Sequence, residues 1–500
     1  MYAVFNFPGQ QLTSQIIIQG FQKVEVLYNN LQASDGSLTF SIPFSTDFCE
    51  ALASNINADV NVFIYNSDST VYASGFIKKE AVFTQQYRNE PIRLTIISPS
   101  YLLDKTLDES YALENKTVAY IVSWLLLQAG FSNVGDLTAL SDVIPLFVFN
   151  SGDNIKTVLK ELCFEYGKTF IFDKDGYFQI ADLFVSSFVS SQAFTRDNIR
   201  GEIEIKVKES EADCIRGRWK PVTLEQDTLV FEDNQGRTNT QDCNIEIAAN
   251  SYFGGIKDNF LTCDSTLGEV QMIKAITHNN IVAESGVNIT LNLEDRTKLD
   301  QVHFTAQNTT SSVKKITRMQ ILADAYICKE TREDVSTYGE KEKAFDLKYI
   351  QTTLPAQRIV KALADYYHAT NFTIGFSSLI DCPIGALITV NADGIANYNC
   401  RIIRKTRQLS RETIEYECEN IGEYTPSEIA ISVQTPLVMN AAIGIKGLDG
   451  QNGGHQDYQF AVGDFGLTDQ QARQLTWYDA PPTIGVGQCL YMATKFIEGE

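Results

Sequence analysis

The pattern of apolar residues changes its period along the chain, and this change constrains the fold more than any other feature. Residues 15–97 are rich in β-branched and aromatic side chains, and turn-forming residues divide them into short runs. The runs at residues 59–64, 71–79 and 93–97 belong to a set of at least five strands, spaced as in a meander or barrel. The sequence therefore predicts a first β-barrel domain, closed or nearly closed, over residues 1–103.

Helical periodicity replaces strand periodicity in the next segment. Apolar residues recur on one helical face between residues 115 and 130, and Gly130 is placed to cap the end of that helix. A second helix is expected to be capped by Asp153 and to end at Gly167. Its apolar stripe consists of Ile155, Val158, Leu159, Leu162 and Tyr166. Both helices are long enough to pack one apolar side against a core.

A β-hairpin is expected directly after the second helix. Residues 169–172 and 177–181 have strand character, and Asp175 and Gly176 between them favour a tight turn. Two helices and a hairpin together predict a small α/β domain over residues 104–198.

Strand character returns between residues 201 and 422. One helix interrupts it, with Pro355 near its start, where a missing backbone N–H costs nothing. Apolar residues that include Ile359, Leu363 and Tyr366 line the inner side of this helix. The clearest strands are residues 202–207, 287–293, 386–390, 401–405 and 413–417. We therefore predict a second β-barrel with insertions over residues 199–425, and a chain that is mainly β with α+β parts.

The last part of the chain has a different composition. Four glycines stand three residues apart, at Gly444, Gly447, Gly450 and Gly453. This is the period of collagen, in which only glycine fits at the threefold axis, but so few repeats without enriched proline cannot hold a triple helix alone. A flexible linker explains the glycines equally well. Residues 426–500 are therefore expected to form a glycine-rich linker and a tip or fibre-like segment.

Charge and cysteine content limit the classes of function. The 41 basic and 62 acidic residues give a formal charge of −21. Because affinity for nucleic acid rests mainly on Lys and Arg, the chain is a poor candidate for wrapping DNA or lying on an anionic membrane. The 10 cysteines are scattered without C-x-x-C spacing, which favours buried free thiols in a reducing cytosol. No signal peptide is evident at the N-terminus, and the apolar stretch 121–127 is too short to span a bilayer.

The order of these parts resembles one known family, the central hub proteins of phage tails. That family includes baseplate hubs, tail-associated (tail-tip) proteins and the hub portion of secretion-system spikes. Residues 94–104 look like the segment that leaves the first hub barrel, and residues 150–181 look like the family's helix and hairpin. Residues 334–390 are similar to its closing module, and residues 475–496 look like a repeat of tail-tip and fibre proteins. Residues 215–325 fit least well and are expected to be an insertion.

The resemblance implies a structural virion protein that assembles as a homotrimer. Two barrels per chain would form a pseudo-sixfold ring that joins a sixfold tail tube, or a distal tail protein ring, to a threefold spike or fibre. The tape-measure protein would be a further partner, with transient contact to the host envelope. DNA would pass through the lumen without specific binding, and the acidic charge could line that lumen. The implied location is the virion, at the tail tip or baseplate, after synthesis in the host cytoplasm.

Little in the sequence points to catalysis or to a metal. The histidines are widely separated and form no zinc motif; they are His278, His303, His368 and His455. The run from Asp173 to Gly176 fits a hairpin turn better than a calcium loop. Acidic groups that could supply a glycosidase pair are more simply explained as solvated faces; they are Glu209, Glu211, Asp213, Glu225, Asp227, Glu232 and Asp233. We expect no catalytic, cofactor-binding or metal-binding residue and no enzyme activity, with a hydrolase domain beyond Glu500 left open.

Two alternative functions come from another class. The chain could be a carbohydrate-active enzyme built of β-modules, which predicts a cleft with paired carboxylates. It could also be a glycan-binding protein in which Trp219 and Trp477 serve as aromatic platforms. The preferred reading of both tryptophans is a role as core or interface anchors.

Overall fold

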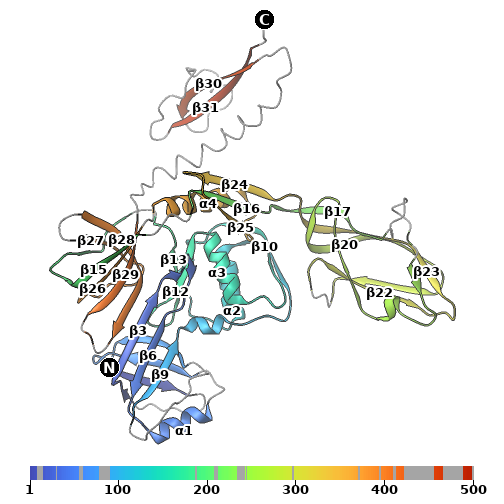
Figure 1. The fold of residues 1–500 in the computed structure, drawn as a ribbon. Coiled ribbons are helices and arrows are strands. Elements are labelled where there is room, and N and C mark those ends of the chain that lie inside the picture. Colours follow the sequence, from blue (N-terminus) through green and yellow to red (C-terminus); the bar gives the residue numbers. More distant parts are fainter. Residues whose placement is uncertain are drawn as a thin grey trace. The chain divides into compact units, whose positions relative to one another are not determined.

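The structure is a computed structural model that describes residues 1–421, 455–464 and 488–497. It leaves out residues 8–14, 30, 56–59, 78–89, 186–187, 208–211, 234–242, 244, 295–297, 370–371, 393–395, 409–410 and 412 within the first of these ranges. The chain divides into two compact units, Met1–Pro426 and Ser427–Glu500. Strands predominate in the described residues, so the predicted mainly β fold class is confirmed (Figure 1).

A circuit of antiparallel strands, here called the first circuit, forms the N-terminal part of a 13-stranded sheet. Neighbours follow the order β3-β6-β9-β8-β7-β1-β2. β2 ends two residues before β3 begins. The first and last strands of this order are therefore neighbours in the chain. This arrangement is compatible with the predicted first barrel. The strands are β1 (Tyr2–Asn6), β2 (Ile16–Ile17), β3 (Gly20–Val26), β6 (Ser37–Ile42), β7 (Asn61–Tyr65), β8 (Val71–Ile77) and β9 (Ile92–Ile97).

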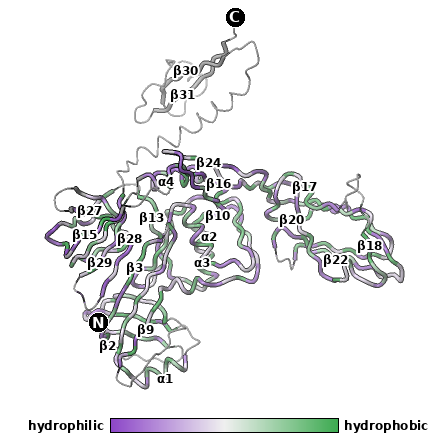
Figure 2. Tube along the Cα trace, in the orientation of Figure 1, coloured by the Kyte–Doolittle hydropathy of each residue, from purple (hydrophilic) through white to green (hydrophobic). Residues whose placement is uncertain are grey.

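Alternating side chains give the first circuit its core. Phe5, Phe40 and Leu94 are each 1% exposed and belong to one buried cluster, and apolar and polar positions alternate along the strands (Figure 2). A short two-stranded ribbon, β4 (Tyr28–Asn29) with β5 (Gln32–Ala33), follows β3. Such alternation is what a strand with one buried face requires.

A helix in this region was not predicted. α1 (Thr46–Ser54) interrupts the segment that the sequence analysis assigned to strands almost throughout, so that assignment is wrong here. The Ser45 side chain caps the helix by accepting from the Phe48 N–H, and Phe48, Ala51 and Leu52 are buried at helical spacing. The apolar residues of α1 span too few residues for their helical period to stand out among the surrounding strands.

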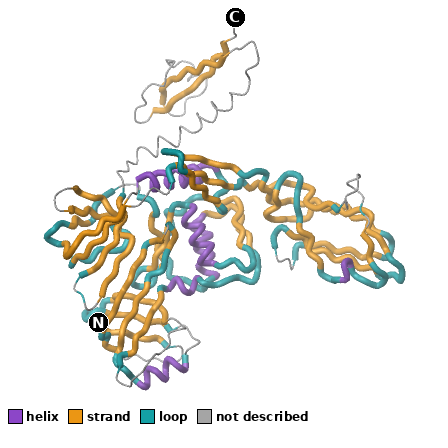
Figure 3. Tube along the Cα trace, in the orientation of Figure 1, coloured by secondary structure: helices purple, strands orange, loops and turns teal. Residues whose placement is uncertain are grey.

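Two predicted helices and the predicted hairpin are confirmed in the next segment (Figure 3). Gly130 and Gly167 adopt the positive φ angles, 83° and 68°, that suit a helix C-cap. The N-cap of the second helix is Asn154, and not Asp153 as predicted. Asn154 has the extended backbone of a cap and accepts from the Thr157 N–H. The elements are η1 (Pro99–Leu103), β10 (Tyr111–Thr117), α2 (Val118–Gln128), β11 (Val143–Phe149), α3 (Ile155–Glu165), β12 (Lys168–Phe172) and β13 (Phe178–Asp182).

The other part of the 13-stranded sheet, here called the second circuit, is built in a similar way. β14 pairs with β27, and β15 pairs with β26. Four residues connect β14 to β15. The pairings β27-β28-β29-β26 complete the circuit. Four of the predicted strands are confirmed here. The strands are β14 (Gln192–Phe194), β15 (Ile199–Val207), β26 (Phe372–Ser378), β27 (Leu387–Ala392), β28 (Ala396–Gln408) and β29 (Ile414–Asn420).

A smaller sheet carries the third predicted helix, α4 (Thr353–Ala369). Its strands lie in the order β24-β16-β25 and are β16 (Cys214–Trp219), β24 (Arg332–Thr337) and β25 (Glu342–Leu347). α4 packs so closely on β16 that a Cβ at Gly217 would lie 2.3 Å from a Val360 methyl group. Glycine is therefore required at this contact.

The strands between residues 222 and 328 form a β-sandwich between β16 and β24, which overlaps most of residues 215–325, the segment expected to be an insertion. One sheet contains β17 (Val222–Glu232), β18 (Ile245–Ile247), β20 (Glu269–Ala283) and β23 (Lys314–Cys328). The other has the order β19-β22-β21 and contains β19 (Asn259–Thr262), β21 (Val287–Asn292) and β22 (Gln301–Asn308). A short turn, η2 (Phe253–Gly255), precedes β19. The strand predicted at residues 287–293 is confirmed as β21.

The second unit contains one described hairpin. β30 (His455–Asp464) pairs antiparallel with β31 (Gln488–Ile497). The glycine repeat at 444–453 and the motif at 475–482 lie outside the described residues, as does Trp477.

Candidate functional site

The two circuits are joined along a seam in which β28 hydrogen-bonds to β3. Residues 404–408 of β28 pair antiparallel with residues 22–26 of β3. The Leu27 N–H extends this pairing by donating to the carbonyl of Ile403 at 2.9 Å. Earlier in its length β28 pairs with β27, and a bulge just before residue 404 marks the change from one partner to the other. β28 therefore belongs to both circuits.

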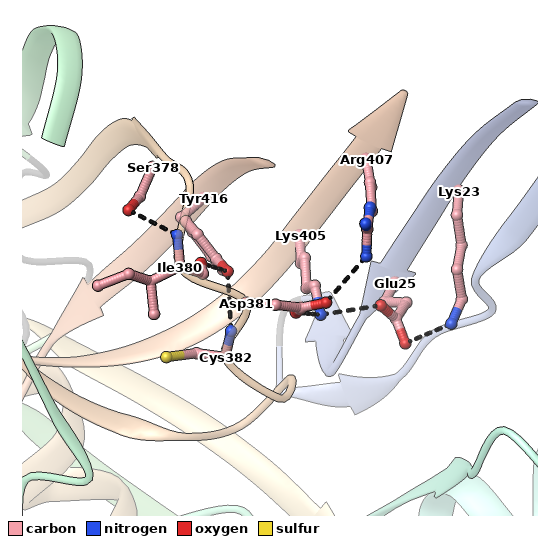
Figure 4. Close-up of polar contacts among 9 residues, drawn as sticks. All are labelled: Lys23, Glu25, Ser378, Ile380, Asp381, Cys382, Lys405, Arg407 and Tyr416. Atoms are coloured by element: carbon pink, nitrogen blue, oxygen red, sulfur yellow. Dashed lines mark hydrogen bonds and ion pairs between the residues drawn. The ribbon is translucent and has the colours of Figure 1, made fainter. Parts of the chain in front are cut away.

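Five charged side chains follow the seam and form a ladder of ion pairs, here called the seam ladder (Figure 4). Lys405 lies opposite Glu25, and Arg407 lies opposite Lys23. The Lys405 Nζ is 3.5 Å from the Glu25 carboxylate and forms a closer ion pair with Asp381. Arg407 lies 3.1 Å from Asp381, and Lys23 lies 2.9 Å from Glu25. The two carboxylates thus offset the repulsion between Arg407 and Lys23, which face each other across the strands.

A tyrosine of the first circuit covers two cations of the seam ladder. The ring centroid of Tyr72, in β8, lies 4.9 Å from the Lys23 Nζ and 5.7 Å from the Arg407 Cζ. Such cation–π contacts contribute about 0.5–2 kcal/mol each. Burial raises the pKa of the Tyr72 hydroxyl well above its usual value, so the ring stays neutral at physiological pH. The seam is therefore held by main-chain bonds, ion pairs and ring contacts together.

Tyr416 fixes the loop that carries Asp381 into the seam ladder. The Tyr416 hydroxyl donates to the carbonyl of Ile380 at 2.7 Å and accepts from the N–H of Cys382 at 2.9 Å (Figure 4). The backbone is thus held on both sides of Asp381. The Ile380 N–H in turn donates to the Ser378 hydroxyl at 3.1 Å. Since Tyr416 is 3% exposed, this clamp is shielded from water.

Removing the clamp should weaken the seam. Tyr416→Phe keeps the ring but leaves the Ile380 carbonyl and the buried Cys382 N–H without their partner, so the free energy of unfolding should fall by about 1–3 kcal/mol. Urea unfolding followed by circular dichroism measures this. Tyr177→Phe, at a hydroxyl-bearing ring that is 44% exposed, is the control and should change little. Equal stability of the two variants would contradict the role of the clamp.

A buried arginine precedes the seam on β28. Arg401 is 5% exposed and lies opposite Glu419, which is 3% exposed. Its guanidinium donates to the carbonyls of Leu183, at 2.9 Å, and of Asp182. The Arg401 Cζ lies 5.6 Å from the ring centroid of Tyr28, whose hydroxyl donates to Glu419 at 3.2 Å. This buried cluster ties the second circuit both to the β12–β13 hairpin and to the chain that follows β3.

A buried glutamate anchors the α/β segment to the chain between β25 and α4. Glu165, the last residue of α3, is 3% exposed. Its carboxylate accepts from the backbone N–H groups of Lys348 at 2.7 Å, Tyr349 at 2.7 Å and Ile350 at 3.1 Å. One side chain therefore satisfies three consecutive backbone donors that precede α4.

Glu165 should make the stability of the chain fall as the pH rises. Burial raises the pKa of Glu165 to about 8, although the three backbone N–H groups favour its charged form. The folded chain therefore binds this proton more tightly than the unfolded chain, in which a glutamate titrates at about 4.3. The resulting stabilisation is complete below that value and is lost as the pH rises through about 8.

Urea unfolding across this pH window tests the effect of Glu165. Glu165→Gln keeps the shape of the side chain but cannot titrate, so its stability should decline less steeply with pH than that of the unmodified chain. Parallel slopes for the two proteins would show that Glu165 does not carry the dependence.

Three of the histidines named in the sequence analysis have described contacts, and these are of different kinds. The His278 Nδ1 lies 3.0 Å from Asp227, and His303 lies between Asn292 and Asp258. His368, in the last turn of α4, stacks on a tyrosine ring. In the described part of the chain, no group of three or more His, Cys, Asp or Glu residues is arranged to hold a metal ion. His455 belongs to β30, and nothing is described of its side chain.

Two of the acidic residues considered as a glycosidase pair have other partners. Glu225 pairs with Lys329 at 2.7 Å, and Asp227 accepts from Thr277 and contacts His278. These contacts lower the pKa of both carboxyl groups, the first through the hydrogen bond from Lys329 and the second through that from Thr277. A general acid needs a raised pKa, so neither group suits that role. Glu209 and Glu211 lie outside the described residues.

Two further sequence interpretations are settled by contacts. Asp173 accepts from the backbone N–H groups of Asp175 and Tyr177, as expected for the hairpin turn preferred over a calcium loop. Trp219 is 2% exposed and donates from its indole to Asp334 at 2.7 Å. It is therefore a core anchor, as preferred, and cannot serve as a platform for a sugar.

Among the described residues, no helix has the length and apolarity needed to cross a membrane.

The residues of the seam were not recognised from the sequence. Lys405 and Arg407 alternate along a strand of which residues 401–405 were predicted, so two cations on one strand face could have been noticed. Their partners Glu25 and Asp381 stand far away in the chain, and no local spacing points to them. Arg401 and Glu419 carry no motif, because ordinary strand residues become a buried pair only through the register of β28 and β29.

Comparison with known proteins finds similarity at the level of fold alone. No protein-family model and no curated protein matches the sequence. The chain is similar to the 43 kDa tail protein of prophage MuSo2 from Shewanella oneidensis, at 9% identity and a TM-score of 0.44, over 86% of this chain and 100% of that one. It is also similar to a tail protein from Neisseria meningitidis MC58, at 10% identity and a TM-score of 0.46, over 85% and 98% of the two chains.

A third similar structure comes from a secretion system. It is the E. coli c3393 protein, described as a type VI secretion component similar to the T4 tail proteins gp27 and gp5. Identity is 10% and the TM-score 0.36, over 84% of this chain and 78% of that one. All three TM-scores are below one half, so these similarities do not establish what this chain does.

Proposed function

We propose that this chain is a structural subunit of a phage-type tail and forms a trimeric hub ring at the tail tip or baseplate. Three copies, each with two strand circuits, place six similar parts around one axis, which suits an adaptor between a sixfold tube and a threefold spike or fibre. The observation that carries this proposal is the seam. Main-chain hydrogen bonds and the seam ladder hold the two circuits of one chain in a fixed relation, as a ring that bears load requires.

The proposed partners are other tail components. The ring contacts the tail tube or a distal tail protein ring on one side and a spike or fibre on the other, and the tape-measure protein ends near it. The subunit has no enzymatic role in this proposal, because it acts by joining parts and by transmitting contact with the host envelope.

DNA passes through the lumen of the proposed ring without specific binding. The formal charge of −21 supports this, because an acidic wall repels a passing polyanion. A ring structure with a neutral or basic lumen would contradict it.

Molar mass in solution tests the assembly. Multi-angle light scattering on the purified full chain should give three times the mass of one chain, unchanged on moderate dilution. A chain that stays monomeric at high concentration, alone and with tube or spike components added, would refute the ring.

A further inference from the structure

The outer face of the three-stranded sheet of the sandwich has a distinctive composition. Side chains alternate between the two faces of its strands, and Leu261, Leu291 and Phe304 point inward to the sandwich core. The outward positions are Phe260 and Thr262 of β19, Gln301, His303, Thr305 and Gln307 of β22, and Asn288, Thr290 and Asn292 of β21. We call this set the uncharged face, because none of its residues is Lys, Arg, Asp or Glu.

The other sheet of the same sandwich is different. Its strands carry an ion pair between Glu246 and Lys315, and Glu225 of β17 pairs with Lys329, which directly follows β23. The uncharged face therefore stands out within its own module, in a chain that contains 41 basic and 62 acidic residues. A solvated surface that served only solubility would be expected to carry both positively and negatively charged side chains.

Contacts across the uncharged face order its centre. Phe260 lies opposite His303, with ring centroids 5.3 Å apart and ring planes inclined by 29°. The His303 Nδ1 lies 3.2 Å from the Asn292 oxygen, and its Nε2 lies 3.2 Å from Asp258 at the edge of the face. Phe260 remains 37% exposed, so an aromatic ring of fixed orientation is presented to solvent.

Polar groups around this ring are available to a ligand. The side chains of Asn288, Thr290, Thr305 and Gln307 make no hydrogen bond to another residue in the described ranges. Asn288 and Thr290 are exposed, and Thr305 and Gln307 are half-buried. Amides and hydroxyls can each both donate and accept. With strands about 4.8 Å apart and alternate residues about 7 Å apart, the face extends over about 10 Å by 14–20 Å.

We propose that the uncharged face binds a neutral oligosaccharide. Sugar hydroxyls both donate and accept, as do the amides and hydroxyls of the face, and the apolar C–H side of a sugar ring can stack on Phe260. Nucleic acid would require Lys or Arg here, and a protein partner would require a more apolar centre. This inference is independent of the proposed ring, because the sandwich carries the whole face.

Binding of the full chain to immobilised neutral hexose and N-acetylhexosamine oligosaccharides tests this. At least one should bind, with little change between low and high salt, because no charge takes part. Phe260→Ala should weaken binding by about tenfold through loss of ring stacking. Thr290→Val, which keeps a β-branched residue and removes one hydroxyl, should weaken it several-fold.

His278→Ala, at a side chain that is 73% exposed on the other sheet, is the control and should bind as the unmodified chain does. Thermal melting of all three variants shows whether the sandwich remains folded. Absence of binding to every neutral oligosaccharide would overturn the proposal. Binding that survives both changes on the uncharged face would overturn it too, as would binding restricted to anionic glycans and abolished by salt. Sugar binding by a chain that stays monomeric even with tube or spike components added would refute the ring and leave the oligosaccharide proposal standing.

Discussion

Arg401→Met should lower the free energy of unfolding of the first unit by about 3–5 kcal/mol, because it removes the cation that lies opposite a buried carboxylate. Glu419 is 3% exposed and lies opposite Arg401 in the sheet. The substitution also removes the donors to the carbonyls of Leu183 and Asp182. Met fills much of the same space, so the loss reports mainly on charge and hydrogen bonding.

Urea unfolding of the purified chain measures the effect of Arg401→Met. Arg93→Met, at an exposed arginine on β9, is the matched control and should change stability by less than about 0.5 kcal/mol. The double variant Arg401→Met with Glu419→Gln should recover part of the loss, because no unpaired charge is then buried. A stability for Arg401→Met equal to that of the control would contradict the account of the buried cluster.

Glu165→Ala should have a similar effect, about 3–5 kcal/mol, for a different reason. It leaves the backbone N–H groups of Lys348, Tyr349 and Ile350 without an acceptor, and the two buried donors, of Tyr349 and Ile350, each cost about 1–3 kcal/mol. Amide hydrogen exchange at Tyr349 and Ile350 should also become faster, because these bonds protect the two amides.

Glu202→Ala, at an exposed glutamate on β15, is the control for this substitution. Unchanged exchange at Tyr349 in the Glu165→Ala variant would contradict the anchoring role, even if global stability fell. If amide exchange becomes faster at Tyr349 and Ile350 but not in the first circuit, the destabilisation lies at the hydrogen bonds lost with Glu165.

The local elements could be predicted because their signals are local. The stripe from Ile155 to Tyr166 and the turn around Asp175 define α3 and its hairpin from a few neighbouring residues. α1 was missed because its apolar positions, Phe48, Ala51 and Leu52, occupy little more than one turn. The domain limits 1–103, 104–198, 199–425 and 426–500 remain predictions.

The candidate site was beyond prediction because it depends on pairing between distant segments. Residues 22–26 and 404–408 carry ordinary strand patterns, and nothing in either segment indicates that they become neighbours. The buried cluster and the Glu165 anchor likewise join residues more than 180 positions apart. The uncharged face shows the opposite case, since alternation in residues 288–292 and 301–307 is visible in the sequence once their strands are known.

Negative-stain imaging of the purified full chain tests the central claim most directly. If two circuits held together by the seam form one subunit of a trimeric hub, averaged images should show a ring with an axial hole and six lobes in three equivalent pairs. Single particles of one chain without a ring, in preparations that also contain tube or spike components, would contradict it.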